Sequence, residues 1–273
     1  MSDPSPAGAH LEHDIPRPRR HPWEIPMVVV GVVVSIGALC VLFVLLVQGV
    51  ELDESLAASV FGLPFLIYLI RGRTYATQRV NGVRITETQF PDAHRILVDA
   101  ARAMGLAKTP DAYVVLGNGV INAFASGHGF RRYLAFHSDL FEVGGRLGDP
   151  DTFAFIAGHE LGHVRAGHAS YWRQLGTAVL NMVPAVGATL SRSQEYTADN
   201  HGYAVCPRGH RGMTVLAAGK YLYPQVDFDA MADRARTDRG FFVFLVNLLA
   251  SHPVNTKRFA ALRDRTRPGR MFF

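Results

Sequence analysis

A continuous apolar segment near the amino terminus most constrains the fold of this chain. Residues 27–49 read MVVVGVVVSIGALCVLFVLLVQG and contain no charged side chain. At a rise of about 1.5 Å per residue, a helix of this length spans the hydrocarbon core of a bilayer, which is about 30 Å thick. The segment is too long for the apolar part of a signal peptide, and no small-residue cleavage site follows it. We therefore expect a transmembrane helix over residues 27–49.

A second, shorter apolar segment lies at residues 56–70 and contains Pro64. It can cross a bilayer if the charged residues at its ends reach the interfaces, and residues 27–70 then form a transmembrane hairpin whose second arm is residues 53–70. The alternative is a re-entrant or interfacial segment, which would put the rest of the chain on the opposite side of the membrane.

The charges around these segments favour the hairpin. Arginines precede the first segment and follow the second, and the turn between them is the acidic ELDES. Because positive charge marks the cytoplasmic side, we expect a multi-pass protein of the cell or inner membrane whose following domain is cytoplasmic. The lipid bilayer is therefore an expected partner.

Composition divides the rest of the chain. Its 273 residues allow a membrane anchor and one compact domain. Residues 1–26 are rich in Pro, His and Arg and predict a disordered basic tail, residues 80–265 have the composition of a folded domain, and residues 266–273 form a second tail. The net charge is +5, but no basic stripe carries interleaved aromatic residues, so a nucleic-acid partner is not expected. The two cysteines lack a CxxC spacing, so any metal must be held by histidine and carboxylate.

Within residues 80–265 the pattern predicts an α+β fold. FPDAHRILVDAARAMGL, with Pro91 near a helix start, predicts an amphipathic helix, and three short strands are expected at AYVVL (112), VINAFA (120) and RYLAF (132). After Ser138 the chain is mainly helical, which predicts a helical domain with a small β-sheet. The apolar stretches 176–190 and 241–250 are interrupted or short, so we expect buried or membrane-leaning helices rather than a third span.

The stretch FIAGHELGHVRAGH, residues 155–168, carries the candidate chemistry. Asp149 and Pro150 predict the start of a helix that runs through it, and on a helix His159 and His163 share one face and can bind one metal ion. Glu160 lies beside them, where a carboxylate can serve as a general base. The flanking glycines at 158 and 162 suggest that another element approaches this helix closely. His168 lies off the shared face and is expected to be a polar surface residue.

A third ligand is expected downstream, because catalytic zinc uses three protein ligands. The segment SRSQEYTADNHG offers Glu195 and Asp199, four residues apart and on one helical face. Glu195 can complete the site, and Asp199 can accept a hydrogen bond from the far nitrogen of a ligand histidine. Without the two histidines, a surface pair of acids would be the default interpretation.

These residues also carry a family resemblance. HELGH followed by SRSQEYTAD resembles the gluzincin peptidases, specifically the membrane zinc metalloproteases that include HtpX and the CAAX-processing proteases. NAFASG (122–127) resembles the substrate-binding edge strand of that family, and SHPVNTKR (251–258) resembles its downstream His-Pro and Arg. The four motifs occur in the family order over about residues 80–265.

The resemblance implies a zincin-like domain with one Zn²⁺ per chain and polypeptide substrates. It implies that Glu160 acts as general base and then as general acid, and that Asp199 supports His159. The remaining implied roles are metal binding by His159, His163 and Glu195, substrate binding by Asn122, Ala123, Phe124 and Ala125, and oxyanion stabilisation by His252 and Arg258.

The expected function is an endopeptidase that cleaves unfolded or membrane proteins in quality control. The region between HELGH and Glu195 is shorter than in HtpX-like members, yet the chain is nearer to these than to the prenyl-protein proteases. A serine hydrolase built on HSD (137–139) is disfavoured because no G-x-S-x-G elbow is present. An intramembrane protease is disfavoured by the charges that bracket the motif. The alternative that stays open is a membrane scaffold with a structural zinc site, against which Glu160 argues because no ligand role requires it.

Overall fold

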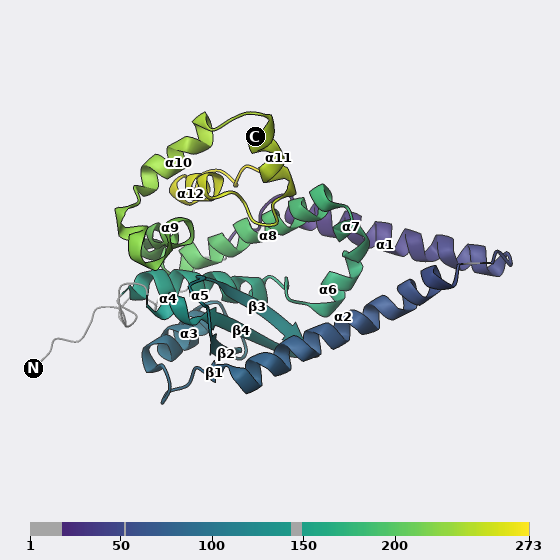
Figure 1. Cartoon of the computed structure of the whole chain (residues 1–273), viewed down its shortest axis with the longest axis horizontal. Coiled ribbons are helices and arrows are strands. Elements are labelled where there is room, and N and C mark those ends of the chain that lie inside the picture. The colour runs from purple at the N-terminus through teal and green to yellow at the C-terminus, as the bar shows by residue number, and fades with distance from the viewer. Residues whose placement is uncertain (1–17, 52, 143–148, 273) are drawn as a thin grey trace, which may run out of the picture.

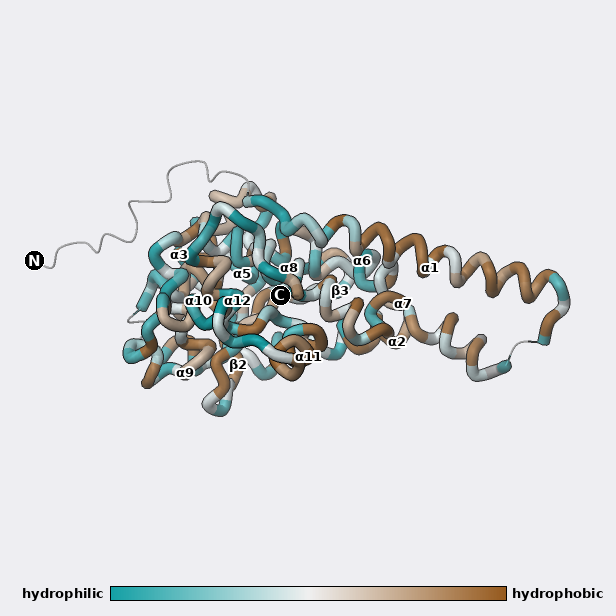
Figure 2. Tube along the Cα trace, turned by 90° about the horizontal axis from the view of Figure 1, so that it is seen from above, coloured by the Kyte–Doolittle hydropathy of each residue, from teal (hydrophilic) through white to brown (hydrophobic). Residues whose placement is uncertain are grey.

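Two long helices project from one side of a compact body. The computed structural model describes residues 18–51, 53–142 and 149–272. The ends of helices α1 (Glu24–Val47) and α2 (Glu54–Asn81) that are joined to each other extend beyond the other elements (Figure 1), and their apolar parts are the brown tubes at the right of Figure 2. Among the described residues, α1 is the helix that is long and apolar enough to cross a membrane, and 6% of its apolar window is buried.

Helix α2 is longer than its apolar segment. It continues for 28 residues through Pro64 and past residue 70. The large side chains of Phe61 and Phe65 are exposed, whereas Tyr75 is buried and packs against Tyr133 with ring centroids 5.1 Å apart. The amino-terminal part of α2 therefore exposes large apolar side chains, and its carboxyl-terminal part is attached to the body.

The segment before α1 is also attached to the body, which differs from the disordered tail expected over residues 1–26. His21 and Glu24 are buried, and the His21 backbone N–H donates a hydrogen bond of 2.9 Å to the Thr197 hydroxyl. This order depends on polar partners far along the chain, which composition does not reveal. Residues 1–17 of that tail lie outside the described residues.

The second expected tail, residues 266–273, is likewise packed as far as it is described. Met271 is buried, and its backbone carbonyl accepts a hydrogen bond of 2.7 Å from the Asn247 side chain. Phe273 lies outside the described residues.

A four-stranded mixed sheet forms one side of the body. Its order is β1 (Val83–Arg84), β2 (Asp111–Val115), β4 (Arg131–His137) and β3 (Ala123–His128), with β2 parallel to β4 and the other pairs antiparallel. Strand β3 lies at an edge. It begins at residue 123 rather than at 120, because the Val120 N–H closes a turn onto the Gly117 carbonyl at 3.0 Å. The two-residue β1 was not expected.

The hydrophobic core joins the sheet to α3 (Pro91–Ala103), α5 (Pro150–Arg165) and the helices that follow them. Helix α3 confirms the predicted amphipathic helix and buries Leu97 and Ala100. Helix α5 begins as predicted, because the Asp149 carboxylate accepts the Thr152 N–H at 2.9 Å and Pro150 occupies the first turn. Its neighbour is α8 (Pro184–Val205), which lies along it.

Glycines allow α5 and α8 to approach closely. A Cβ added at Gly162 would lie 2.6 Å from Cβ of His201, and one added at Gly158 would lie 2.9 Å from Cβ of Val205. The element expected to approach the glycines of the motif is therefore α8, which also carries Glu195.

Short helices complete the body. The stretch 176–190 is divided among separate helices rather than forming one transmembrane helix. The Ser35 hydroxyl of α1 donates a hydrogen bond of 2.9 Å to the Gly176 carbonyl, so this stretch lies against the apolar part of α1. The remaining elements are α4 (Ser138–Phe141), α6 (Tyr171–Gly176), α7 (Ala178–Asn181), η2 (Pro207–Thr214), α9 (Val215–Leu222), η3 (Tyr223–Gln225), α10 (Phe228–Thr237), α11 (Phe241–Leu249) and α12 (Asn255–Arg263).

Candidate active site

Helices α5 and α8 bring together the three expected ligand residues. Nε2 of His159 lies 3.1 Å from Nε2 of His163, and each of these nitrogens lies 3.4 Å from an oxygen of Glu195. Zinc bonds of about 2.0–2.2 Å at tetrahedral angles separate neighbouring ligand atoms by about 3.3–3.5 Å. The two nitrogens and the carboxylate therefore fit one zinc ion in both donor type and spacing.

Glu160 lies beside this group without belonging to it. Its side chain is buried and lines the same cleft as His159 and His163. Burial raises the pKa of the Glu160 carboxyl above its usual value, because a charged carboxylate loses hydration there. A carboxyl group with a raised pKa binds a proton more readily than an exposed one, which suits a group that accepts and then returns a proton.

Behind His159 lies a buried ion pair. The Asp199 carboxylate is 2.9 Å from Nδ1 of His159, and Arg258 donates hydrogen bonds of 2.8 and 2.6 Å to the two oxygens of Asp199. Burial favours the protonated form of Asp199, but Arg258 and His159 hold its pKa below the usual value. The carboxylate therefore stays charged and orients His159.

His168 lies behind the second histidine, and the expectation of a surface residue was wrong. It is buried, its Nδ1 is 2.8 Å from Nδ1 of His163, and its Nε2 is 3.1 Å from Oε1 of Glu24. Burial lowers the pKa of His168 to about 4. Helix α5 ends at Arg165 instead of continuing to His168, and Gly167 takes a φ of 79°, which turns the chain back. A glycine just after the expected helix was the available signal.

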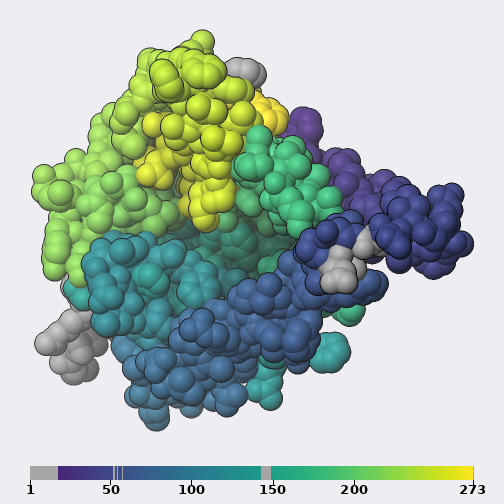
Figure 3. All heavy atoms as spheres, turned by 45° about the vertical axis from the view of Figure 1, so that its right-hand side comes forward, coloured from purple at the N-terminus to yellow at the C-terminus, as the bar shows by residue number. Residues whose placement is uncertain are grey.

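The ligand group, which consists of His159, His163 and Glu195, opens into a cleft of about 390 Å³. One wall is the edge strand β3 with the residue before it, and the opposite wall belongs to the segment from His252 to Arg258. Figure 3 shows a hollow between the yellow-green carboxyl-terminal part and the blue and teal part of the chain. All four residues expected to bind substrate line the cleft. Asn122 is exposed, and Ala123, Phe124 and Ala125 are half-buried.

The two residues expected to stabilise an oxyanion each contact the ligand group. Nδ1 of His252 lies 3.0 Å from Glu195, and its side chain is 69% exposed towards solvent. The guanidinium of Arg258 is buried and engaged by Asp199. The oxyanion role of both residues stays a prediction. The contacts allow His252 to hold Glu195 in place and Arg258 to hold Asp199, which supports His159.

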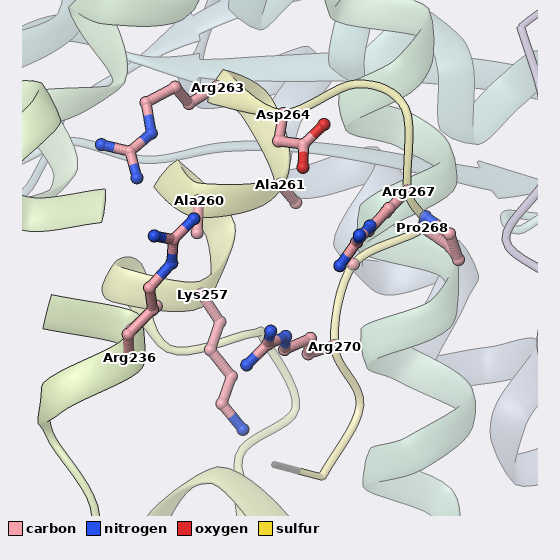
Figure 4. Close-up of a pocket in the computed structure, with 11 residues that line it drawn as sticks. Arg236, Lys257, Ala260, Ala261, Arg263, Asp264, Arg267, Pro268 and Arg270 are labelled. Atoms are coloured by element: carbon pink, nitrogen blue, oxygen red, sulfur yellow. The ribbon is translucent and has the colours of Figure 1, made fainter. Parts of the chain in front are cut away.

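A second, smaller pocket of about 110 Å³ lies away from this cleft, between α10, α12 and the carboxyl-terminal segment. Figure 4 shows the long side chains of Arg236, Arg267 and Arg270 around it. Lys257 is buried there and donates a hydrogen bond of 2.8 Å to the Phe272 carbonyl. Several cationic side chains therefore line this pocket, whereas the expected metal ligands line the cleft.

Comparison with known proteins identifies the family. None of the curated proteins compared matches the chain. A family model described as Peptidase family M48 matches residues 87–187 and 169–266, which together include the cleft, the ligand group and well over half of the chain. The chain therefore belongs to Peptidase family M48, a family of metal-dependent peptidases.

Proposed function

We propose that the chain is a membrane-anchored zinc endopeptidase that cleaves unfolded or membrane polypeptides. One observation carries this proposal. The ligand atoms of His159, His163 and Glu195 lie within 4.8 Å of one another, and Glu160 stands beside them as a buried carboxyl group in an open cleft. Membership of a peptidase family supports the reaction class. The role in quality control rests on the resemblance to HtpX-like proteases.

Residues around the cleft have complementary roles in this reaction. A bound zinc ion would polarise the scissile carbonyl and lower the pKa of a water molecule. Glu160 accepts a proton from the attacking water and passes it to the leaving amine. His252 and Arg258 supply positive charge or donors to the developing oxyanion.

Substrate binding is assigned to the free edge of β3. This strand pairs on one side with β4, and its residues Ala123 to Ala125 line the cleft. An extended peptide can add to such an edge through backbone hydrogen bonds, a mode of recognition that depends little on side chains. Broad specificity for unfolded chains is the expected consequence.

Membrane anchoring by two spans is supported by where the helices are attached. Glu24, in the first turn of α1, contacts Arg173 of the body at 2.9 Å, and Arg71 of α2 donates a hydrogen bond of 2.7 Å to the Ala169 carbonyl. Both attachment points therefore belong to one body. If α1 leaves that body and crosses the bilayer, the chain must return across it through α2.

The surface beside α1 has the properties of a membrane interface. Trp23 packs against Phe272 with ring centroids 6.1 Å apart, and α11, which exposes Phe241 and Phe242, lies on the side of the body towards which α1 projects (Figure 1). The cationic pocket of Figure 4 adjoins this surface through Arg270. Interfacial tryptophan, exposed apolar residues and positive charge suit the headgroups of an acidic bilayer.

Cleavage of an unfolded model protein tests the proposed activity. The detergent-purified chain with zinc restored is compared with Glu160→Gln under identical conditions, and bound zinc is measured in both. We expect one zinc in each and fragments from the parent alone. Equal cleavage by the variant would refute Glu160 as the base. If both preparations bind zinc and neither cleaves, the structural-zinc scaffold becomes the better explanation.

A further inference from the structure

A chain of three side chains joins the first turn of α1 to the ligand His163. Oε1 of Glu24 lies 3.1 Å from Nε2 of His168, and Nδ1 of His168 lies 2.8 Å from Nδ1 of His163. Glu24 is fully buried, and His168 is 6% exposed. We infer that Glu24 and His168 are positioning residues that fix the proton of His163 and thereby present its Nε2 to the metal. This inference rests on the proposed metal site.

The partners of Glu24 determine where the first proton lies. Its carboxylate also accepts hydrogen bonds from Arg20, Arg173 and Thr197, so donors surround it and it remains an anion. An ionised carboxylate can only accept hydrogen bonds. Nε2 of His168 must therefore carry a hydrogen and donate it to Glu24.

The contact between His168 and His163 then has one arrangement of hydrogens that leaves His163 able to bind a metal. Two ring nitrogens 2.8 Å apart need one hydrogen and one lone pair between them. With its hydrogen on Nε2, neutral His168 offers a lone pair at Nδ1, so Nδ1 of His163 is the donor. This leaves the lone pair of Nε2 of His163 facing Glu195, whereas the opposite arrangement would place a hydrogen on that nitrogen and prevent metal binding.

The two ligand histidines are thus supported in different ways. Asp199 contacts His159 directly, while the carboxylate behind His163 acts through His168. Asp199 lies in α8, next to the ligand group, but Glu24 lies at the start of the apolar helix. The attachment of α1 to the body therefore contributes to the metal site itself.

Zinc affinity in the full-length chain tests the inference. His168→Phe keeps a planar ring but removes both nitrogens, and His168→Gln restores a donor for Glu24 and an acceptor for His163. The matched control is His210→Phe, because His210 lies between Tyr203 and Phe228, away from the ligand group. The dissociation constant for zinc is measured by competition with a chelator, beside the melting temperature of each metal-free variant.

We expect His168→Phe to weaken zinc binding by about 10–100-fold, the range typical for residues that support metal ligands. His168→Gln should recover most of this loss, and His210→Phe should bind zinc as the parent does. Recovery of zinc affinity in His168→Gln would show that His168 acts through its hydrogen bonds and not only by filling space. A parent that binds no zinc would overturn the proposed metal site and this inference together. If the parent binds zinc and His168→Phe binds it with the same affinity, the inference about Glu24 and His168 is overturned and the proposed metal site stands.

A second measurement needs no folded variant. Nitrogen-15 NMR of histidine-labelled, zinc-loaded parent reports which ring nitrogen of His168 carries the hydrogen. A hydrogen on Nε2 is expected. A hydrogen on Nδ1 would exclude His168 as the acceptor for His163 and overturn the proposed chain of contacts.

Discussion

At the scale of single residues, the candidate site combines pairs that follow helical spacing with contacts that depend on distant segments. Residues His159 and His163 lie four apart on one helix, and so do Glu195 and Asp199, so periodicity alone places each pair on one face. The approach of His168 and Glu24 depends instead on a turn after α5 and on the docking of a distant segment. Such contacts have no periodic signal, which is why the sequence did not reveal them.

Asp199→Asn tests the buried pair behind His159. The change removes the carboxylate that lies nearest to the buried guanidinium of Arg258, and breaking a buried ion pair typically destabilises a protein by about 3–5 kcal/mol. It also weakens the support of His159, so zinc affinity should fall by about 10–100-fold. Denaturant unfolding and chelator competition measure the two effects.

The control for that change is Asp233→Asn. Asp233 pairs with Arg263 at 2.8 Å, but its side chain is 64% exposed. Exposed pairs contribute about 0–1 kcal/mol, so this variant should unfold and bind zinc much as the parent does. If both variants lose the same free energy of unfolding, burial of the Asp199 pair is not what makes it important.

At the scale of elements, packing of α5 on α8 sets the geometry of the site, because the histidines come from one helix and Glu195 from the other. The start of α5 could be predicted from its capping residues, and its glycines indicated a close neighbour. The partner could not be identified, since nothing in the pattern links residue 162 to residue 201. The start of β3 was expected too early in the chain, because the sequence did not reveal that the turn before the strand extends to Val120.

Gly162→Ala tests this packing. The new Cβ would lie 2.6 Å from that of His201, so the helices must separate. Overpacking of this kind typically destabilises a protein by about 1–3 kcal/mol, and the shift should also weaken zinc binding by moving Glu195 away from the histidines. Gly37→Ala is the control, because an added Cβ there meets nothing within 4 Å. Unchanged unfolding and zinc affinity in Gly162→Ala would show that the helices can adjust without disturbing the ligands.

At the scale of the whole molecule, the proposed metal site and the proposed anchor are parts of one structure. The body holds the start of α1 through Glu24 and the end of α2 through Arg71 and Tyr75. Apolar composition predicted α1, and charge predicted a hairpin as one of two alternatives. The contacts at both ends favour the proposed hairpin, and they are tertiary contacts that leave no trace in hydropathy.

The positions of two introduced cysteines test the proposed topology. In a chain with Cys40 and Cys206 replaced by alanine, Gln48→Cys lies at the far end of α1 and Lys108→Cys lies on the exposed surface of the body. If both helices cross, a membrane-impermeant thiol reagent should label Gln48→Cys in intact cells and reach Lys108→Cys only after permeabilisation. Labelling of Lys108→Cys in intact cells would place the body outside. If the reagent labels both cysteines equally, α1 lies along the membrane rather than across it. The attachment of both helices to one body would then say nothing about topology.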